Sequence, residues 1–176
     1  MKVKKLAVYA AIVAAFILYL CFANTLMLMF NDNAALSKVS FDSFTGKDEV
    51  YQIADGFQYL GGMYEVAYLQ GWAFCETDQD NSDKVITLIF RSTDSDDCYA
   101  VETKAQARDD VYGAFRDIVN VYNGMNGIEC QFSTVNMKNG TYKFYVAVKE
   151  NEQNSGISNT GMLFEKTASG LYQVEE

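Results

Sequence analysis

The sequence of 176 residues contains no histidine and no proline. Without histidine, the usual general base for serine or cysteine nucleophiles and the commonest zinc ligand are missing, which argues against cysteine-dependent hydrolysis and zinc catalysis. The sequence also lacks a P-loop, a glycine-rich dinucleotide turn and a nucleophile elbow. We therefore predict that the protein is not an enzyme.

Basic residues are scarce after the N-terminus. Lys2, Lys4 and Lys5 contribute three positive charges to a formal net charge of -9, so the remainder of the chain carries -12. Such a surface repels phosphate backbones and anionic lipid head groups, which argues against nucleic acid as a partner. Cations, basic proteins and neutral sugars fit this charge better.

Residues 6–30 contain no charged side chain. As a helix they span about 37 Å, enough to cross a bilayer with some tilt, and they predict a single-pass signal anchor in the cell membrane. The positive-inside rule places residues 1–5 in the cytoplasm and the C-terminal domain outside the cell. The alternative is a signal peptide cleaved after Ala23, but the apolar run continues through Phe30, which favours retention.

Three of the four cysteines follow the apolar run, and Cys21 lies within it. Cys130 alternates with apolar residues along a predicted strand, so we expect it to face the core as a small hydrophobic residue. Cys75 and Cys98 lie at predicted strand ends and are the candidates for a disulfide in an oxidising compartment. Three reduced thiols are the alternative.

The region after residue 48 consists of short β-branched and aromatic runs separated by turn residues. We interpret residues 31–48 as a stalk or linker that packs partly against the domain, and residues 49–176 as an all-β antiparallel sandwich of about 7–8 strands. Helical spacing of apolar residues predicts one short crossing helix that starts near Arg108. The predicted strands are 50–53, 64–75, 84–91, 98–103, 127–132, 141–149, 161–166 and 171–174.

Acidic residues cluster in two of the predicted turns. Asp78, Asp80 and Ser82 alternate like the oxygen ligands of a Ca²⁺ loop, and Asp83 follows directly. Ca²⁺ is therefore a candidate ligand of Asp78, Asp80 and Asp83, although the glycine and the bidentate glutamate of an EF-hand are missing. A solvated hairpin turn is the alternative, and we expect no other cofactor.

Three residues are candidates for ligand binding. Trp72 is the only tryptophan and alternates with aromatic residues along one strand, where its ring is either a stacking platform for a sugar or part of the core. Arg108 and Asp110 stand at the start of the predicted helix. They either grip a ligand as an ion pair, or Arg108 bridges the helix to the sheet.

A series of short motifs adds a resemblance to these observations: Gly71-Trp72-Ala73-Phe74, then Arg108-Asp109-Asp110-Val111 with Phe115, then Asn139-Gly140-Thr141-Tyr142. Together they resemble an extracellular β-sandwich module of membrane proteins associated with the cell envelope and its polysaccharides in Gram-positive bacteria. The family pattern usually has proline after the arginine, where this chain has Asp109. The resemblance implies a non-catalytic accessory or binding role and supplies no ligand.

Three functions follow as hypotheses. The first is a membrane-tethered extracellular module that binds an envelope glycan or an envelope partner protein without catalysis. The second is an accessory subunit of a membrane complex that packs through its helix, where alanines at helical spacing permit close contact. The third is a wall-polymer hydrolase that depends on paired carboxylates.

Overall fold

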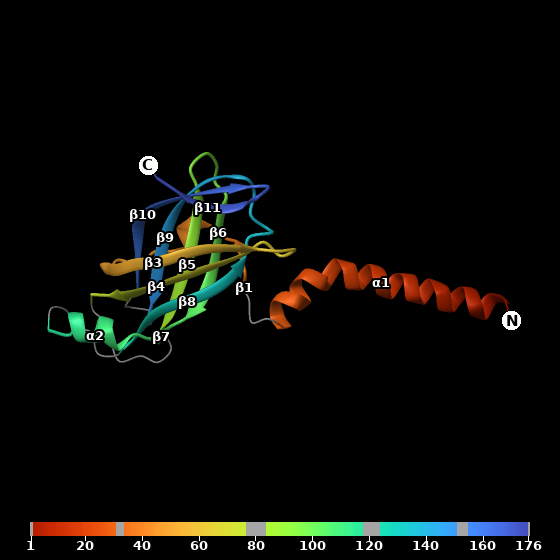
Figure 1. The fold of residues 1–176 in the computed structure, drawn as a ribbon, viewed down its shortest axis with the longest axis horizontal. Helices are drawn as coiled ribbons and strands as arrows, with labels where there is room; N and C mark the ends of the chain where they lie inside the picture. Colours follow the sequence, from red (N-terminus) through yellow and green to blue (C-terminus); the bar gives the residue numbers. More distant parts are fainter. Residues whose placement is uncertain (1, 31–33, 77–83, 118–123, 151–154, 176) are drawn as a thin grey trace.

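The computed structural model describes residues 2–30, 34–76, 84–117, 124–150 and 155–175. In these residues two β-sheets pack face to face, and two α-helices lie at opposite ends (Figure 1). In sheet A the order is β1 (Ala34–Ala35), β8 (Met125–Ser133), β4 (Val66–Cys75) and β3 (Val50–Gly61), with β7 (Gln106–Ala107) also paired to β8. In sheet B the order is β11 (Gly170–Val174), β10 (Ser155–Thr167), β9 (Gly140–Lys149), β5 (Val85–Ser92), β6 (Cys98–Lys104) and β2 (Ser37–Lys38).

The pairings are antiparallel except for the parallel contact of β1 with β8. This mostly-β chain with two curled sheets fits the sandwich predicted from the sequence. The strand β3 is much longer than predicted. It continues past the predicted end at residue 53 and past Gly56, with irregularities at Ala54/Gly56 and Tyr59/Gly61, and it ends at Gly61 in the predicted turn.

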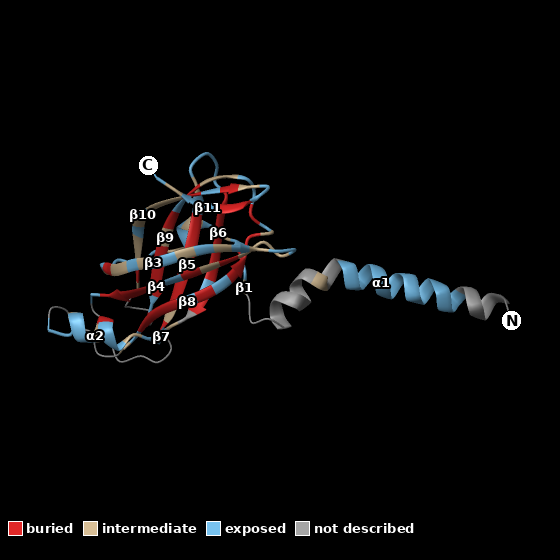
Figure 2. Cartoon of the chain, in the orientation of Figure 1, coloured by how far each residue is buried: buried red, intermediate tan, exposed pale blue. Residues whose placement is uncertain are grey.

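The core lies between the sheets because side chains of successive strand residues point to opposite faces. Along β5, Ile86, Leu88 and Phe90 face inward and are fully buried, whereas Ile89 belongs to a second cluster on the outer face of sheet B. The central strands are accordingly the buried part of the molecule (Figure 2).

The helix α2 (Asp109–Phe115) covers a third apolar cluster, on the outer face of sheet A. Its position confirms the prediction of a short helix near Arg108. Asp109 and Asp110 lie in its first turn, where the partial positive charge of the helix end favours acidic side chains. Val111 and Phe115 pack toward the sheet.

The segment 34–48, which we call the strap, belongs to the folded domain. It pairs with β8 through β1, inserts Leu36 fully buried into the core, and then pairs with β6 through β2. The short η1 helix (Phe41–Ser43) follows on the outer face of sheet B. The prediction of a stalk up to residue 48 is therefore corrected: the domain begins at Ala34, because an apolar side chain and two strand pairings hold this segment in place.

The helix α1 (Lys2–Phe30) is one continuous helix that projects away from the sheets (Figure 1). Its side chains at residues 7–20 are all exposed, including large apolar residues such as Tyr9 at 65% and Phe16 at 60%. Within the described part of the chain, no helix meets the combined length and hydropathy of a membrane span.

The candidate disulfide between Cys75 and Cys98 is not formed, and the alternative of three reduced thiols is the one that the structure shows. In the described structure Cys75, Cys98 and Cys130 are all buried and no disulfide joins them. Cys75 belongs to the core between the sheets, whereas Cys98 belongs to the cluster on the outer face of sheet B. The prediction for Cys130 is confirmed, since it lies in the core. Burial raises the pKa of Cys98 and of Cys130 to about 11, so both thiols stay protonated near neutral pH.

Candidate functional site

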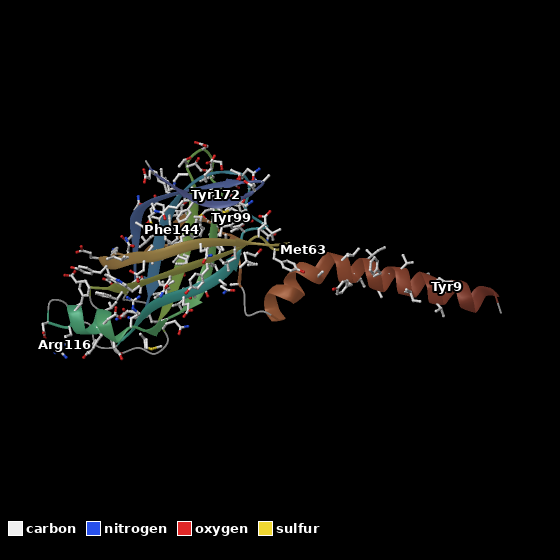
Figure 3. All side chains as sticks on the ribbon, in the orientation of Figure 1. Tyr9, Met63, Tyr99, Arg116, Phe144 and Tyr172 are labelled. Atoms are coloured by element: carbon white, nitrogen blue, oxygen red, sulfur yellow. The ribbon has the colours of Figure 1, made fainter. Side chains whose placement is uncertain are left out.

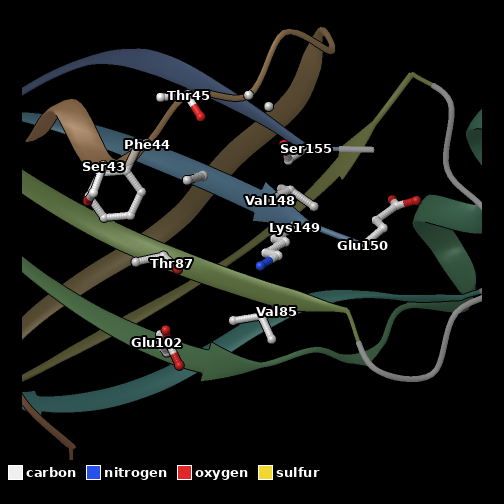
Figure 4. Close-up of a pocket in the computed structure, with 13 residues that line it drawn as sticks. Ser43, Phe44, Thr45, Val85, Thr87, Glu102, Val148, Lys149, Glu150 and Ser155 are labelled. Carbon is white, nitrogen blue, oxygen red and sulfur yellow. The ribbon is translucent and has the colours of Figure 1, made fainter. Parts of the chain in front are cut away.

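A groove runs over the outer face of sheet B, beside the strap. Its larger part has a volume of about 510 Å³ and lies between residues 43–46 of the strap and the strands β5, β6 and β9 (Figure 4). A second hollow of about 340 Å³ adjoins it toward β1 and β2. Both parts are lined by Phe44, Thr87 and Glu102, so the two hollows are neighbours at Phe44 of the strap.

The floor of the groove is a row of side chains across neighbouring strands. Glu102 on β6 is directly opposite Thr87 on β5, and Thr87 is opposite Ala147 on β9. Because side chains opposite each other in a sheet share one face, these three lie side by side. Glu102 is exposed, whereas Thr87 is only 9% exposed. The floor thus offers a carboxylate, a hydroxyl and a small apolar surface in line.

The wall of the groove comes from the strap and from the end of β9. Ser43 and Thr45 contribute exposed hydroxyl-bearing side chains, Phe44 contributes a half-buried ring, and Lys149 contributes an exposed ammonium group (Figure 4). The lining therefore mixes one aromatic ring with hydroxyls and charges of both signs. Pockets for small ligands typically have volumes of this size and a few polar groups that fix orientation.

Two glycines allow the strap to close one side of the groove. A Cβ atom on Gly46 would lie 2.4 Å from the backbone nitrogen of Gly156, and one on Gly156 would lie 2.3 Å from the carbonyl oxygen of Asp48. The backbone amide of Asp48 also donates to the Ser155 carbonyl oxygen at 3.0 Å. The strap and the start of β10 are in direct backbone contact, which only glycine at both positions permits.

Aromatic contacts hold the middle of the strap on the sheet. The Phe41 ring packs edge-on against Tyr145 of β9, with 5.0 Å between the ring centroids. The guanidinium carbon of Arg91 lies 4.3 Å from the centroid of the same Phe41 ring. Val39 and Phe44 pack with Phe41 over Ile89, Cys98 and Ala147.

An ion cluster at Asp97 fastens the start of the strap. Its carboxylate accepts hydrogen bonds from Lys38 of β2 and from Lys138, the latter at 2.8 Å. Hydrogen bonds from Lys138 and Lys38 lower the pKa of Asp97 from its ordinary value of 3.8 to about 2. The Asp97 side chain is only 12% exposed, so water screens these pairs less than it screens pairs on the open surface.

Buried charges lie at the far end of the groove. Glu150 lines the groove and is almost fully buried, and the Lys84 ammonium group lies 3.5 Å from its carboxylate. Lys84 also donates to the Asn126 amide oxygen at 2.7 Å, and the Asn126 side chain is fully buried. This pairing compensates the charge of Glu150, so Glu102 is the exposed acid of the groove.

Of the predicted ligand-binding residues, Trp72 lies in an aromatic cluster under α2. It is only 7% exposed, and its ring centroid lies 5.2 Å from that of Phe115 and 5.6 Å from that of Phe74. The interpretation of Trp72 as a stacking platform is therefore corrected, because α2 covers the ring and leaves no face open to a sugar. The core alternative is the one that the structure shows.

Arg108 and Asp110 are brought together, as predicted, in a paired geometry. Arg108 donates to both Asp110 carboxylate oxygens at 2.8 Å and to Asp55 of β3 at 2.8 Å. It also approaches the Gly71 carbonyl oxygen of β4 at 3.4 Å. Arg108 thus bridges α2 to sheet A, as in the second of the two predicted roles. Its hydrogen bonds lower the pKa of Asp110 to about 2.

The predicted Ca²⁺ ligands Asp78, Asp80 and Asp83 lie outside the described residues. Within the described ranges, no group of three or more acidic or cysteine side chains is arranged to hold a metal ion.

Sequence reasoning missed Phe44, Thr87 and Glu102. Thr87 and Glu102 were detectable only as single polar residues that interrupt apolar strands, a pattern that indicates an outward face but no site. The groove exists because the strap crosses that face, and this long-range contact has no local sequence signal.

No family model, no curated protein and no solved structure matches the chain. The resemblance to the Gram-positive envelope module accordingly stays a prediction.

Proposed function

We propose that the protein is a membrane-tethered accessory protein whose domain lies outside the cell and binds an envelope glycan in the strap groove, without catalysing a reaction. The observation that carries this proposal is the row of Glu102, Thr87 and Ala147 beneath the Phe44 ring. Sugars present hydroxyl groups on their edges and a weakly polar face, and this lining complements both.

The arrangement favours a neutral or cationic sugar over an anionic one. Glu102 accepts hydrogen bonds from sugar hydroxyls, and the Thr45 hydroxyl can donate and accept. The Ser43 hydroxyl donates to the Ser40 carbonyl oxygen at 2.7 Å, so it is available to a ligand as an acceptor. Hydrogen bonds to a charged acceptor are stronger than those between neutral groups. The net charge of -12 on the chain after residue 5 disfavours polyanionic polymers.

The proposed tether is α1. A helix whose side chains are apolar on every side needs a surrounding of lipid or of other helices, and the exposed side chains of residues 7–20 are all uncharged. Three lysines before the apolar run support an N-terminus in the cytoplasm. Tethering also raises the effective concentration of a binding domain toward nearby polymers.

The test is a binding titration of the detergent-solubilised full chain with purified wall polysaccharide. We expect Glu102→Gln to weaken binding roughly tenfold, since a hydrogen bond to a charged group contributes about 1.5–3 kcal/mol. The matched control is Glu165→Gln, which removes the same charge from an exposed position on β10 away from the groove. Equal binding by the Glu102→Gln variant and the wild type contradicts the proposal, and turnover of the polymer supports the hydrolase alternative instead.

A second candidate is an accessory subunit of a membrane complex that packs through α1. Ala7, Ala10, Ala11, Ala14 and Ala15 are exposed small residues that permit close helix contact. Replacing α1 with an unrelated apolar helix is expected to destroy assembly in this case and to leave glycan binding intact in the first.

A further inference from the structure

The tip of the β3–β4 hairpin is the most exposed apolar feature of the sheets. Met63 is 81% exposed and Leu60 is 47% exposed. Leu60 directly precedes Gly61 and Gly62, and Met63 directly follows them. Residues 57–64 contain no charged side chain, although the domain is strongly acidic. Exposure of these apolar side chains to water is unfavourable, so contact with an apolar partner surface would stabilise the tip.

The tip has a fixed shape. Gly61 and Gly62 both adopt positive φ angles, of 75° and 82°, and the amide of Glu65 closes the turn on the Gly62 carbonyl oxygen at 3.1 Å. At its base, the Ser133 hydroxyl donates to the Tyr64 carbonyl oxygen at 2.6 Å and the Thr134 hydroxyl donates to that of Glu65 at 3.0 Å. The exposed side chains are therefore presented by an ordered turn.

The same residue, Ser133, also connects the hairpin to the chain that leaves α1. The Leu36 amide donates to the Ser133 carbonyl oxygen at 3.2 Å, and Ala34 pairs with Phe132. From Phe30, the last residue of α1, to Ala34 there are four Cα–Cα steps, which span at most about 14 Å. Whatever direction α1 takes, its C-terminal end stays close to this hairpin.

Figure 3 shows Met63 on the side of the domain that faces α1, and Arg116 of the α2 region at the opposite end. The acidic residue next to the tip is neutralised, because the Lys166 ammonium group lies 2.9 Å from the Glu65 carboxylate. The end of the domain nearest to α1 thus presents an uncharged tip with a compensated acid behind it.

We propose that the β3–β4 hairpin tip inserts Leu60 and Met63 into the interface of the bilayer in which α1 is anchored. This inference rests on the proposed membrane tether. Apolar side chains gain free energy in the acyl region, and the flexible Met63 side chain adapts to irregular lipid packing. A two-point attachment through α1 and the tip fixes the orientation of the domain and directs α2 away from the membrane.

The test is fluorescence of an environment-sensitive probe attached to one introduced cysteine, in the full chain reconstituted in phosphatidylcholine vesicles. Cys21→Ala removes the thiol in α1, and Cys75, Cys98 and Cys130 are buried, so the introduced cysteine is the accessible one in the described structure. The same chain without an introduced cysteine gives the background labelling. The three variants are Met63→Cys, Ile12→Cys in α1, and Ala114→Cys. Ala114 is the matched control because it is exposed on α2, at the far end of the domain. The vesicles are prepared with and without a lipid that carries a doxyl quencher near its head group.

We expect the doxyl lipid to remove most of the emission at position 63 and to leave the emission at position 114 unchanged. If position 63 is as unquenched as position 114 while position 12 is quenched, the tether holds and the hairpin inference is overturned. If position 12 is unquenched as well, the proposed tether itself fails. A probe at position 63 that shifts to the blue without quenching indicates a second protein chain over the tip and also overturns the inference.

Discussion

Lys38 of β2 and Asp97, the residue before β6, form an ion pair that joins the start of the strap to the neighbouring strand of sheet B. Lys138 completes the cluster from the segment before β9, so three segments far apart in the sequence meet at one carboxylate. The strap is thereby fixed at its beginning, in its middle by Phe41 and at its end by the contact of Gly46 with β10.

The first prediction concerns acid stability. Because the pKa of Asp97 falls from 3.8 to about 2 on folding, its ionised form stabilises the fold above about pH 4, and this contribution is lost as the pH falls toward 2. We expect Asp97→Asn to flatten the dependence of unfolding free energy on pH in this window. Asp110 titrates in the same range, so part of the slope persists.

Urea unfolding at a series of pH values measures this slope. Asp96→Asn is the control, since Asp96 is exposed in the same turn. An identical slope in wild type and Asp97→Asn would show that the cluster does not stabilise the fold.

The second prediction concerns the middle of the strap. Phe41→Ala removes the edge contact with Tyr145 and the cation–π contact with Arg91, and we expect a loss of about 1–2 kcal/mol in unfolding free energy. Because Phe41 covers the cluster that contains Cys98, the Cys98 thiol should also react faster with a maleimide. Cys130 lies between the sheets and should keep its rate, and faster reaction of both thiols would point to global unfolding instead.

The third prediction tests the close backbone contact. Gly46→Ala places a methyl group 2.4 Å from the backbone of Gly156, so we expect the strap to lift, the protein to lose stability and the groove to lose ligand affinity. Gly113→Ala is the control, because nothing lies within 4 Å of a Cβ atom there. Alanine in this helix should stabilise the protein by roughly 0.5–1 kcal/mol. The melting temperatures of both variants measure these effects. A Gly46→Ala variant as stable as the wild type would contradict the close contact between Gly46 and Gly156.

The fourth prediction separates the two roles weighed for Arg108. If Arg108 only bridges α2 and sheet A, we expect Arg108→Ala to lower the free energy of unfolding by about 1 kcal/mol and to leave glycan binding intact. Arg116→Ala should have almost no effect on stability, because Arg116 is 57% exposed and its nearest carboxylate contact is 3.9 Å long. Loss of binding by Arg108→Ala at an unchanged melting temperature would indicate instead that Arg108 binds the ligand.

The sequence predicted the strands best where apolar alternation continued without interruption. The strand predicted at 84–91 is β5 (Val85–Ser92), shifted by one residue. The predicted strand boundaries were wrong where turn residues lie inside a strand. The structure has β10 beginning at Ser155, whereas the prediction began at residue 161, and a register irregularity lies between Asn159 and Leu163. A β-bulge of this kind is stabilised by the neighbouring strand, which the sequence alone does not identify.

The candidate site was beyond sequence reasoning for a related reason. Trp72 and Arg108, which the sequence pattern predicted as ligand-binding residues, instead hold α2 on sheet A. The groove depends on Phe44, in a segment without helical or strand periodicity, meeting Thr87 about forty positions later in the chain. Composition predicted an acidic domain, whose charge fits cations, basic proteins or neutral sugars, but it did not predict the groove beside the strap.

Hydrogen–deuterium exchange of the full chain, with and without purified wall polysaccharide, tests the central claim most directly. If the glycan binds in the strap groove, peptides that contain residues 43–46 and Glu102 should exchange more slowly in its presence, and peptides from α2 should be unchanged. Protection confined to α2, or no protection anywhere at saturating polysaccharide, would contradict the account.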